Sequence, residues 1–255
     1  MRSLFQSRPP EAPPTVEPVR TEFPRIEGAE MAAVFYGKRV AGDFYDAIRV
    51  SPERILFGLL DVAGRREDTR EILTAAQKIL RGLGAELFAQ PDINESDAMT
   101  ELCLTLNRRI MDTAGGVRSC PGFVGCYHEK LGTLCYTNAG HTNGLLHDHS
   151  GVVELVPTGL PLGLFSHATS DAPIVGLEAG AVLLLVSRGV VEATCRECDS
   201  DDLAFGLERV KGQLRSQAAA DAQAFCTSIL GAIGERGHQQ PVPDDMTALA
   251  LVRKA

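Results

Sequence analysis

The chain has 255 residues, of which 44% are hydrophobic and 23% are charged, so it is long enough for one large domain or two small ones. This composition excludes a wholly disordered chain, a collagen-like fibre and a disulfide-dense mini-protein. With 25 Lys and Arg against 33 Asp and Glu, the net charge is -8, which argues against binding to nucleic acid or to an anionic membrane. The sequence has no apolar run long enough to predict a transmembrane helix. Its odd number of cysteines, 7, predicts a cytoplasmic protein with reduced thiols.

The first segment of the chain is rich in proline. Six of the 14 prolines lie within the first 24 residues, and each one fixes φ and removes a backbone donor. Residues 1–25 are therefore predicted to form a flexible tail, either a passive spacer or a ligand for a proline-recognition domain. A single compact domain is predicted over residues 26–255.

Predicted strands and helices follow in blocks. Short apolar or alternating runs predict strands over 31–37, 44–50 and 55–62, and apolar residues at helical spacing then predict helices over 72–87 and 94–110. Strand patterns return over 123–129, 133–138, 144–148, 152–156 and 181–187. A helix near Leu203, a helix over 222–233 and a strand over 247–253 complete the chain. Helices grouped between runs of strands predict an α+β fold of layered, mostly antiparallel sheets.

Aspartates stand at the ends of several predicted strands. Asp61 ends the third strand, Asp43 precedes the second, and Asp244 and Asp245 precede the last. A carboxylate at a sheet end needs water, a hydrogen-bond donor or a cation. If these acids converge, they form an oxygen-rich pocket suited to Mg²⁺ or Mn²⁺, although each one taken singly is equally an ordinary turn residue.

Six short motifs, in this order, carry a family resemblance. They are Gly42-Asp-Phe-Tyr-Asp, Leu60-Asp-Val-Ala-Gly, Asn138-Ala-Gly-His, Leu160-Pro-Leu-Gly-Leu, Ser187-Arg-Gly-Val-Val-Glu-Ala and Asp244-Asp-Met-Thr. From about residue 26 to 254 the chain resembles the stage II sporulation protein E-like branch of the metal-dependent PPM protein phosphatases. The resemblance implies two antiparallel sheets packed face to face and flanked by helices. It also implies a Mg²⁺ or Mn²⁺ site that hydrolyses phosphoserine or phosphothreonine on a partner protein.

The resemblance also implies roles for individual residues. Asp61 corresponds to the carboxylate that bridges two ions, with the Val62 carbonyl beside it. Asp43 resembles the acid of the opening motif, and Asp244 resembles the ligand before the last strand. Three further residues resemble framework positions of the family: Asn138, Gly140 and His141.

The chain departs from the family pattern at two places. Arg188 stands where the family has a metal-binding Asp, and a guanidinium cannot ligate a cation. We expect Arg188 to pair with Asp61 and Asp244 and to displace one ion. Arg66 follows Arg65 where the family usually has Gly, and either Arg66 or Arg188 could bind phosphate instead.

Two interpretations follow from these departures. In the first, the chain is a protein serine/threonine phosphatase with one or two Mn²⁺ or Mg²⁺ ions, acting on a phosphorylated regulatory protein in bacterial signalling. In the second, it is a pseudophosphatase that keeps the fold and binds a phosphoprotein partner without turnover. A plain scaffold without a phosphate site is a third possibility. The pairs Cys195/Cys198 and His147/His149 are predicted to be ordinary surface turns rather than metal sites.

Overall fold

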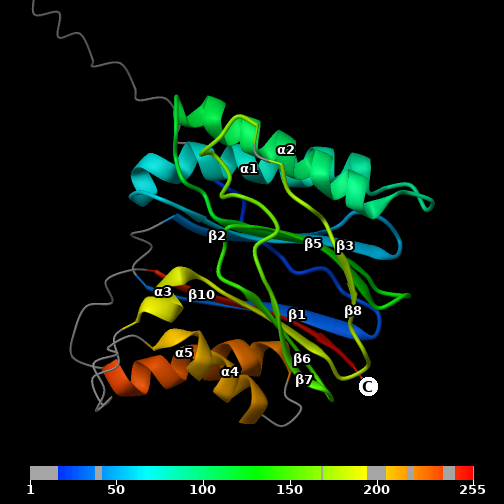
Figure 1. Cartoon of the computed structure of the whole chain (residues 1–255), viewed down its shortest axis with the longest axis vertical. Helices are drawn as coiled ribbons and strands as arrows, with labels where there is room; N and C mark the ends of the chain where they lie inside the picture. The colour runs from blue at the N-terminus through cyan, green and yellow to red at the C-terminus, as the bar shows by residue number, and fades with distance from the viewer. Residues whose placement is uncertain are drawn as a thin grey trace, which may run out of the picture.

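Two five-stranded sheets lie face to face between two layers of helices (Figure 1). The structure is a computed structural model that describes residues 17–37, 42–167, 169–193, 205–216, 221–237 and 245–254. The first sheet has the order β1 (Ala29–Tyr36), β10 (Met246–Arg253), β9 (Val182–Val186), β6 (Gly144–Asp148) and β7 (Gly151–Leu155). The second sheet has the order β2 (Gly42–Arg49), β3 (Arg54–Val62), β4 (Gly122–His128), β5 (Thr133–Ala139) and β8 (Ile174–Gly176).

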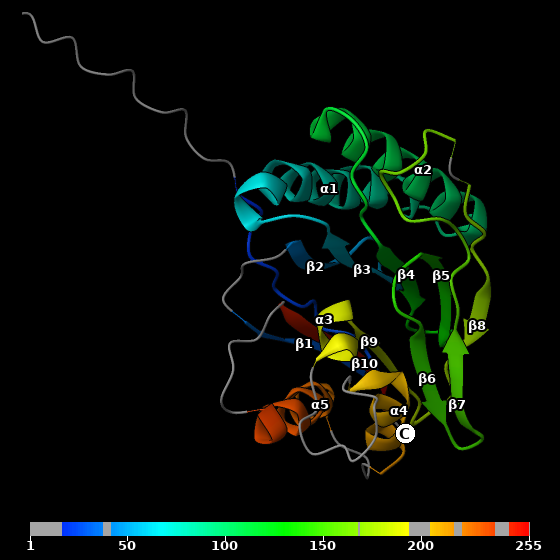
Figure 2. The same ribbon diagram turned by 60° about the vertical axis from the view of Figure 1, so that its left-hand side comes forward.

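Helices cover the outer face of each sheet (Figure 2). The second sheet is covered by α1 (Arg66–Leu87) and α2 (Glu95–Ala114), and the first by α4 (Gly206–Ser216) and α5 (Ala222–Gly237). A short helix, α3 (Arg188–Glu192), follows β9. The predicted α+β sandwich of antiparallel sheets is confirmed.

Local sequence accounts for the bounds of the two long helices. Two acidic residues, Glu67 and Asp68, stand in the first turn of α1, where they interact favourably with the helix dipole. In α2 the Asn94 side chain caps the amino end by accepting hydrogen bonds from the backbone of Ser96 and Asp97. The helix ends at Ala114, and the next residue, Gly115, has a left-handed φ of 65° that suits glycine.

Burial on both faces explains why the central strands are apolar throughout. All nine residues of β3 are buried, because one face packs against α1 and α2 and the other against the first sheet. A third apolar cluster fills the space between the first sheet and α4 and α5. The predicted strands and long helices therefore lie where their apolar patterns placed them, while the short β8 and α3 were not predicted.

The N-terminal segment 17–24 lies against β2 and α1. The buried Gln77 side chain pairs with the Val19 backbone in both directions, accepting from its N–H and donating to its carbonyl at 2.7 Å each. The Thr21 hydroxyl donates to the Tyr45 carbonyl at 2.8 Å, and the Phe23 and Tyr45 rings stack at 5.9 Å between centroids. This part of the predicted tail is thus held to the domain, while residues 1–16 lie outside the described residues.

Two remaining features concern membranes and thiols. No helix in the described ranges combines the length and apolarity needed to cross a bilayer. The five cysteines in those ranges are free and buried, and burial raises the pKa of the Cys103 thiol to about 12. Cys195 and Cys198 lie outside the described residues.

Candidate metal and phosphate site

Asp43 and Asp61 lie directly opposite each other on neighbouring antiparallel strands, β2 and β3. Opposed residues of an antiparallel pair project to the same face of the sheet, so this register brings the two carboxylates together. Asp61 is buried near the end of β3. Gly42 faces Val62 in the same ladder, and a Cβ at Gly42 would collide with the Val62 carbonyl oxygen. Glycine therefore allows the close approach of the two strands at the candidate ligands.

Thr247 links Asp43 to the other sheet. The Thr247 hydroxyl on β10 donates to Asp43 Oδ2 at 2.7 Å. Thr247 is itself fixed, because its N–H donates to Ser187 Oγ at 3.0 Å and its carbonyl accepts from the Ser187 N–H at 2.9 Å. The ends of β9 and β10 thus position a carboxylate that belongs to the second sheet.

Arg188 follows Ser187 and is the first residue of α3. Its Nε atom lies 3.8 Å from Asp61 Oδ2 and 4.0 Å from Glu192 Oε1. The Arg188 side chain is 55% exposed, while that of Asp61 is 10% exposed. The expected ion pair between Arg188 and Asp61 is confirmed, whereas Asp244 lies outside the described residues.

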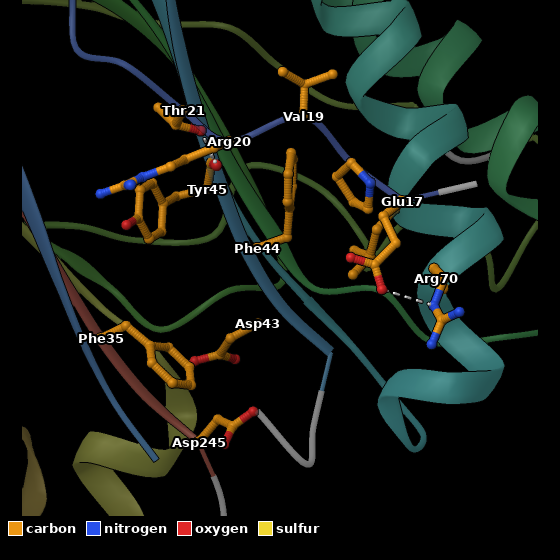
Figure 3. A pocket seen from close by; sticks show the side chains of 12 residues that line it. Glu17, Val19, Arg20, Thr21, Phe35, Asp43, Phe44, Tyr45, Arg70 and Asp245 are labelled. Carbon is orange, nitrogen blue, oxygen red and sulfur yellow. Dashed lines mark hydrogen bonds and ion pairs between the residues drawn. The ribbon is translucent and has the colours of Figure 1, made fainter. Parts of the chain in front are cut away.

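A pocket of about 410 Å³ is lined by Asp43 and Asp245, whereas Asp61 does not line it (Figure 3). Asp43 and Asp245 lie near Phe35 in one part of it, and an ion pair of 3.4 Å between Glu17 and Arg70 lies in another. The segment 17–21 forms one wall. A substrate that reaches the carboxylates from this side would therefore contact the N-terminal segment.

The three predicted framework residues make hydrogen bonds or close contacts within the fold. Asn138 Oδ1 accepts from the His141 N–H at 2.8 Å, and Asn138 Nδ2 donates to the Leu155 carbonyl at 3.1 Å. Gly140 has a left-handed φ of 67°, and a Cβ there would press against Pro161. His141 is buried, and desolvation lowers its pKa to about 4, so it is neutral at physiological pH.

Arg118 adjoins the site and was not singled out by the sequence. Its Nη1 atom donates to the Ala63 carbonyl at 2.8 Å. The chain around Arg118 runs beside the turn after β3, since Ala63 N–H donates to the Ser119 carbonyl at 2.9 Å and Asp61 N–H to the Pro121 carbonyl at 2.8 Å. Arg118 belongs to none of the recognised motifs, so only this pairing reveals its position. The other predicted phosphate ligand, Arg66, begins α1 immediately after the turn.

The donor atoms at this end of the sheet suit a hard cation. Two carboxylates, from Asp43 and Asp61, and the Val62 carbonyl offer only oxygen, which favours Mg²⁺ or Mn²⁺ over softer metals. Among the described residues, however, no three His, Cys, Asp or Glu side chains group closely enough to hold a metal ion. The chemistry of the donors therefore fits a divalent cation, while Arg188 contributes a competing positive charge beside Asp61.

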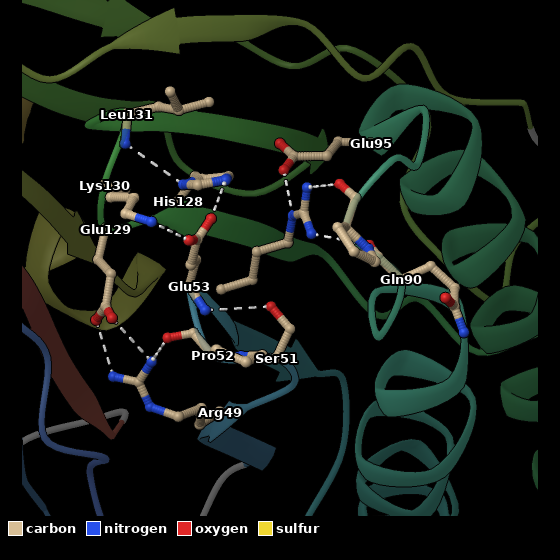
Figure 4. Close-up of polar contacts among 12 residues, drawn as sticks. Arg49, Ser51, Pro52, Glu53, Gln90, Glu95, His128, Glu129, Lys130 and Leu131 are labelled. Carbon is tan, nitrogen blue, oxygen red and sulfur yellow. Dashed lines mark hydrogen bonds and ion pairs between the residues drawn. The ribbon is translucent and has the colours of Figure 1, made fainter.

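A second charged cluster lies at the opposite end of β3 (Figure 4). The buried Arg54 guanidinium donates to Glu95 at 2.6 Å and to the carbonyls of Gln90 and Pro91 at 2.9 Å each. Nearby, Glu53 pairs with Lys130 on the surface. The Arg54 bonds tie the start of β3 to the α1–α2 connection, which is a structural role.

Comparison with known proteins places this geometry in a family. The sequence profile of stage II sporulation protein E (SpoIIE) matches residues 51–254, and no curated protein sequence matches the chain. Among solved structures, the RsbU and RsbW domains of a Mycobacterium tuberculosis protein align with a TM-score of 0.69 at 21% identity, covering 91% of this chain and 62% of that one.

Two further structures share the fold. The PP2C phosphatase domain of Bacillus subtilis SpoIIE, solved with a fragment of its regulatory domain, has a TM-score of 0.69 at 17% identity, with 93% and 64% of the two chains covered. The SiaA PP2C domain of Pseudomonas aeruginosa has a TM-score of 0.71 at 17% identity, with 88% and 86% covered. The chain spans less than two thirds of the first two structures. Its profile match and its two-sheet architecture establish that the chain belongs to the SpoIIE family of PPM phosphatases.

Proposed function

We propose that the chain is a metal-dependent protein serine/threonine phosphatase that acts on a phosphorylated regulatory protein in bacterial signalling. The observation that carries this proposal is the register of β2 and β3, which sets Asp43 opposite Asp61 beside the Val62 carbonyl in a SpoIIE-family fold. Asp244, next to the buried Asp245, is proposed as a further ligand. Mn²⁺ or Mg²⁺, as one or two ions, is the proposed cofactor.

The chain's own residues would have separate tasks in this reaction. Asp43, Asp61 and the Val62 carbonyl would hold the cation, and the Thr247 hydroxyl would keep Asp43 oriented. A divalent cation bound there would neutralise phosphoryl oxygens and lower the pKa of a water molecule. Because that water would supply the nucleophile, the reaction would require no nucleophilic side chain.

Positive side chains around the acids would receive the phosphate. A guanidinium binds phosphate oxygens through two parallel hydrogen bonds. Arg188, half exposed beside Asp61, and Arg66, at the start of α1, are the proposed phosphate ligands. Each would compensate part of the charge that a full set of metal ions supplies elsewhere in the family.

The ion pair between Arg188 and Asp61 favours a second function. With Nε 3.8 Å from Asp61 Oδ2, Arg188 places a permanent charge where a cation would bind. In this alternative the chain is a pseudophosphatase, which binds a phosphoprotein partner without hydrolysing it.

One experiment separates the two functions. Mn²⁺ binding would be measured by calorimetry, and hydrolysis of a phosphoserine peptide would be followed in parallel. The wild type would be compared with Asp61→Asn and with a matched control, Asp92→Asn, at an exposed turn. Binding and turnover that only Asp61→Asn abolishes would support the phosphatase. Peptide binding without Mn²⁺ binding or turnover at millimolar Mn²⁺ would support the pseudophosphatase instead.

A further inference from the structure

Two loop segments are hydrogen-bonded in succession beside the turn that follows Asp61. The Ala63 N–H donates to the Ser119 carbonyl at 2.9 Å. Cys120 then pairs with Leu162 in both directions, at 2.8 and 3.1 Å, and the Arg118 N–H donates to the Gly163 carbonyl at 3.1 Å. A single backbone segment, residues 118–120, therefore separates the loop that contains residues 160–165 from the turn after Asp61.

This loop is fixed by a buried amide. Asn107, on α2, is fully buried, and its Oδ1 accepts from the Gly163 N–H at 2.7 Å while its Nδ2 donates to the Phe165 carbonyl at 2.9 Å. Gly163 has a left-handed φ of 79°, and a Cβ there would collide with the Arg118 carbonyl. The loop and the segment at Arg118 thus hold each other in one arrangement.

Three large apolar side chains on these fixed segments face solvent. Val117 is 71% exposed, Phe165 is 55% exposed and Leu160 is 51% exposed. A single exposed apolar residue is ordinary on a protein surface. Three of them on adjacent, hydrogen-bonded segments beside the candidate metal and phosphate site are typical of an interaction surface.

Arg118 supplies charge at the same place. A guanidinium has five N–H donors. Arg118 Nη1 donates one hydrogen bond to the Ala63 carbonyl at 2.8 Å. That bond holds the guanidinium against the turn between Asp61 and α1, while the residue stays partly exposed. The chain as a whole carries a net charge of -8, so a fixed cation here favours an anionic partner locally.

We propose that Arg118 and the three apolar side chains form a docking surface for the phosphoprotein, with Arg118 contacting the phosphate and the apolar residues contacting hydrophobic side chains next to it. We call this set, Val117, Arg118, Leu160 and Phe165, the docking surface. The inference rests on the proposed function, because it assigns the orientation of the same substrate. The occupant is a phosphoserine or phosphothreonine segment flanked by apolar residues.

Two labelled phosphoserine peptides test the docking surface. One carries leucines on both sides of the phosphoserine, and the other carries serines at the same positions. Their binding would be measured by fluorescence anisotropy with Mn²⁺ present, together with their hydrolysis and that of p-nitrophenyl phosphate. The variants are the double change Leu160→Ser/Phe165→Ser and a matched control, Val153→Ser, which alters a residue on β7 that is 52% exposed.

The wild type is expected to bind the leucine peptide more tightly than the serine peptide. The double variant should weaken leucine-peptide binding by about tenfold, as expected for loss of apolar anchors, and should leave the serine peptide and p-nitrophenyl phosphate unchanged. Arg118→Met should weaken both peptides and raise the inhibition constant of inorganic phosphate, and Arg118→Lys should restore part of that affinity. Unchanged Mn²⁺ affinity in these Arg118 variants separates phosphate contact from a purely structural role.

The outcomes distinguish this inference from the proposed function. Turnover without discrimination between the peptides, or equal losses in Val153→Ser, would overturn the docking surface and leave the phosphatase intact. Discrimination that the double variant removes, without turnover of any substrate, would support the docking surface and overturn the phosphatase. Failure of both peptides to bind would overturn the docking surface, and failure to hydrolyse p-nitrophenyl phosphate as well would also overturn the phosphatase.

Discussion

Arg188 Nε lies 3.8 Å from Asp61 Oδ2, so an arginine is paired with the carboxylate that the SpoIIE family resemblance assigns to metal binding. The register of β2 and β3 sets Asp43 across from the same carboxylate. Asp61 therefore has two neighbours of opposite charge. The Asp43 carboxylate would share a cation with it, and the Arg188 guanidinium would compete with that cation. If the proposed metal site is correct, the balance between these two neighbours would set how many ions it holds.

Replacing Arg188 by aspartate tests that balance. Arg188→Asp removes a positive charge beside Asp61 and adds an oxygen ligand, so the affinity for Mn²⁺ should rise by roughly tenfold or more, on the scale known for changes around metal ligands. Phosphatase activity should rise with it. Calorimetric titration measures the first effect and peptide hydrolysis the second. Arg215→Asp, an exposed change on α4, is the control, and the same Mn²⁺ affinity in both variants would show that Arg188 lies outside the metal site.

The Thr247 hydroxyl is expected to tune the metal site through Asp43. Thr247→Val keeps the shape of the buried side chain but removes the 2.7 Å hydrogen bond to Asp43 Oδ2. Loss of a partner that orients a ligand lowers metal affinity by about 10–100-fold. Titration with Mn²⁺ checks this, and Thr247→Ser should retain most of the affinity. Equal affinity in Thr247→Val and the wild type would contradict a positioning role for the hydroxyl.

The buried ion pair at the far end of β3 should matter for stability and not for catalysis. Arg54→Met leaves the Glu95 carboxylate and two backbone carbonyls without their donor, which should lower the free energy of unfolding by about 3–5 kcal/mol. Lys130→Met breaks an exposed pair with Glu53, which solvent screens, and should leave the free energy of unfolding nearly unchanged. Urea unfolding of the two variants measures the difference. A small loss in Arg54→Met would show that the pair is not well desolvated.

Stability should depend on pH through His141. Burial lowers the pKa of His141 to about 4 from its ordinary value of 6.5. Between these two values the unfolded chain binds a proton that the folded chain does not, so stability is highest above pH 6.5 and falls as the pH drops towards 4. Once the pH lies below both pKa values, the free energy of unfolding has fallen by about 3 kcal/mol.

Urea unfolding at about pH 7.5 and about pH 5 measures this dependence. The loss between the two conditions should be smaller in His141→Asn than in the wild type, because asparagine does not titrate. His167→Asn, at an exposed position, should retain the wild-type dependence. Identical pH dependence in the wild type and His141→Asn would exclude His141 as the source.

The N-terminal segment should be released by a change on α1. Gln77→Leu removes both hydrogen bonds that hold the exposed Val19 backbone to α1, and each such bond typically stabilises the bound arrangement by about 1 kcal/mol. Trypsin should then cleave after Arg20 or Arg25 at least several-fold faster than in the wild type, which limited proteolysis with mass spectrometry measures. Gln213→Leu on α4, away from this segment, is the control.

Periodicity and motif order were sufficient to predict most of the fold. The apolar runs that became β3 and β9 are continuous because both faces of each strand are buried, and the 3.6-residue spacing that became α1 and α2 reflects one buried face per helix. These signals are local, so they can be read without coordinates. The ion pair of Arg188 with Asp61 was also predictable, because the motifs place both residues in the family site.

Other features depend on which chain segments become neighbours after folding. Thr247 and Asp43 are 204 residues apart and meet because the two sheets stack. Arg118 reaches the Ala63 carbonyl, and Gln77 holds Val19, across separations of 55 and 58 residues. Local patterns and motif order thus predicted the longer strands and helices, the layered architecture and the acids proposed for the candidate site. The partner that orients Asp43, the segment that lies beside the turn after β3 and the place where the N-terminal segment docks emerge only after folding, because these contacts join segments whose proximity no local pattern encodes.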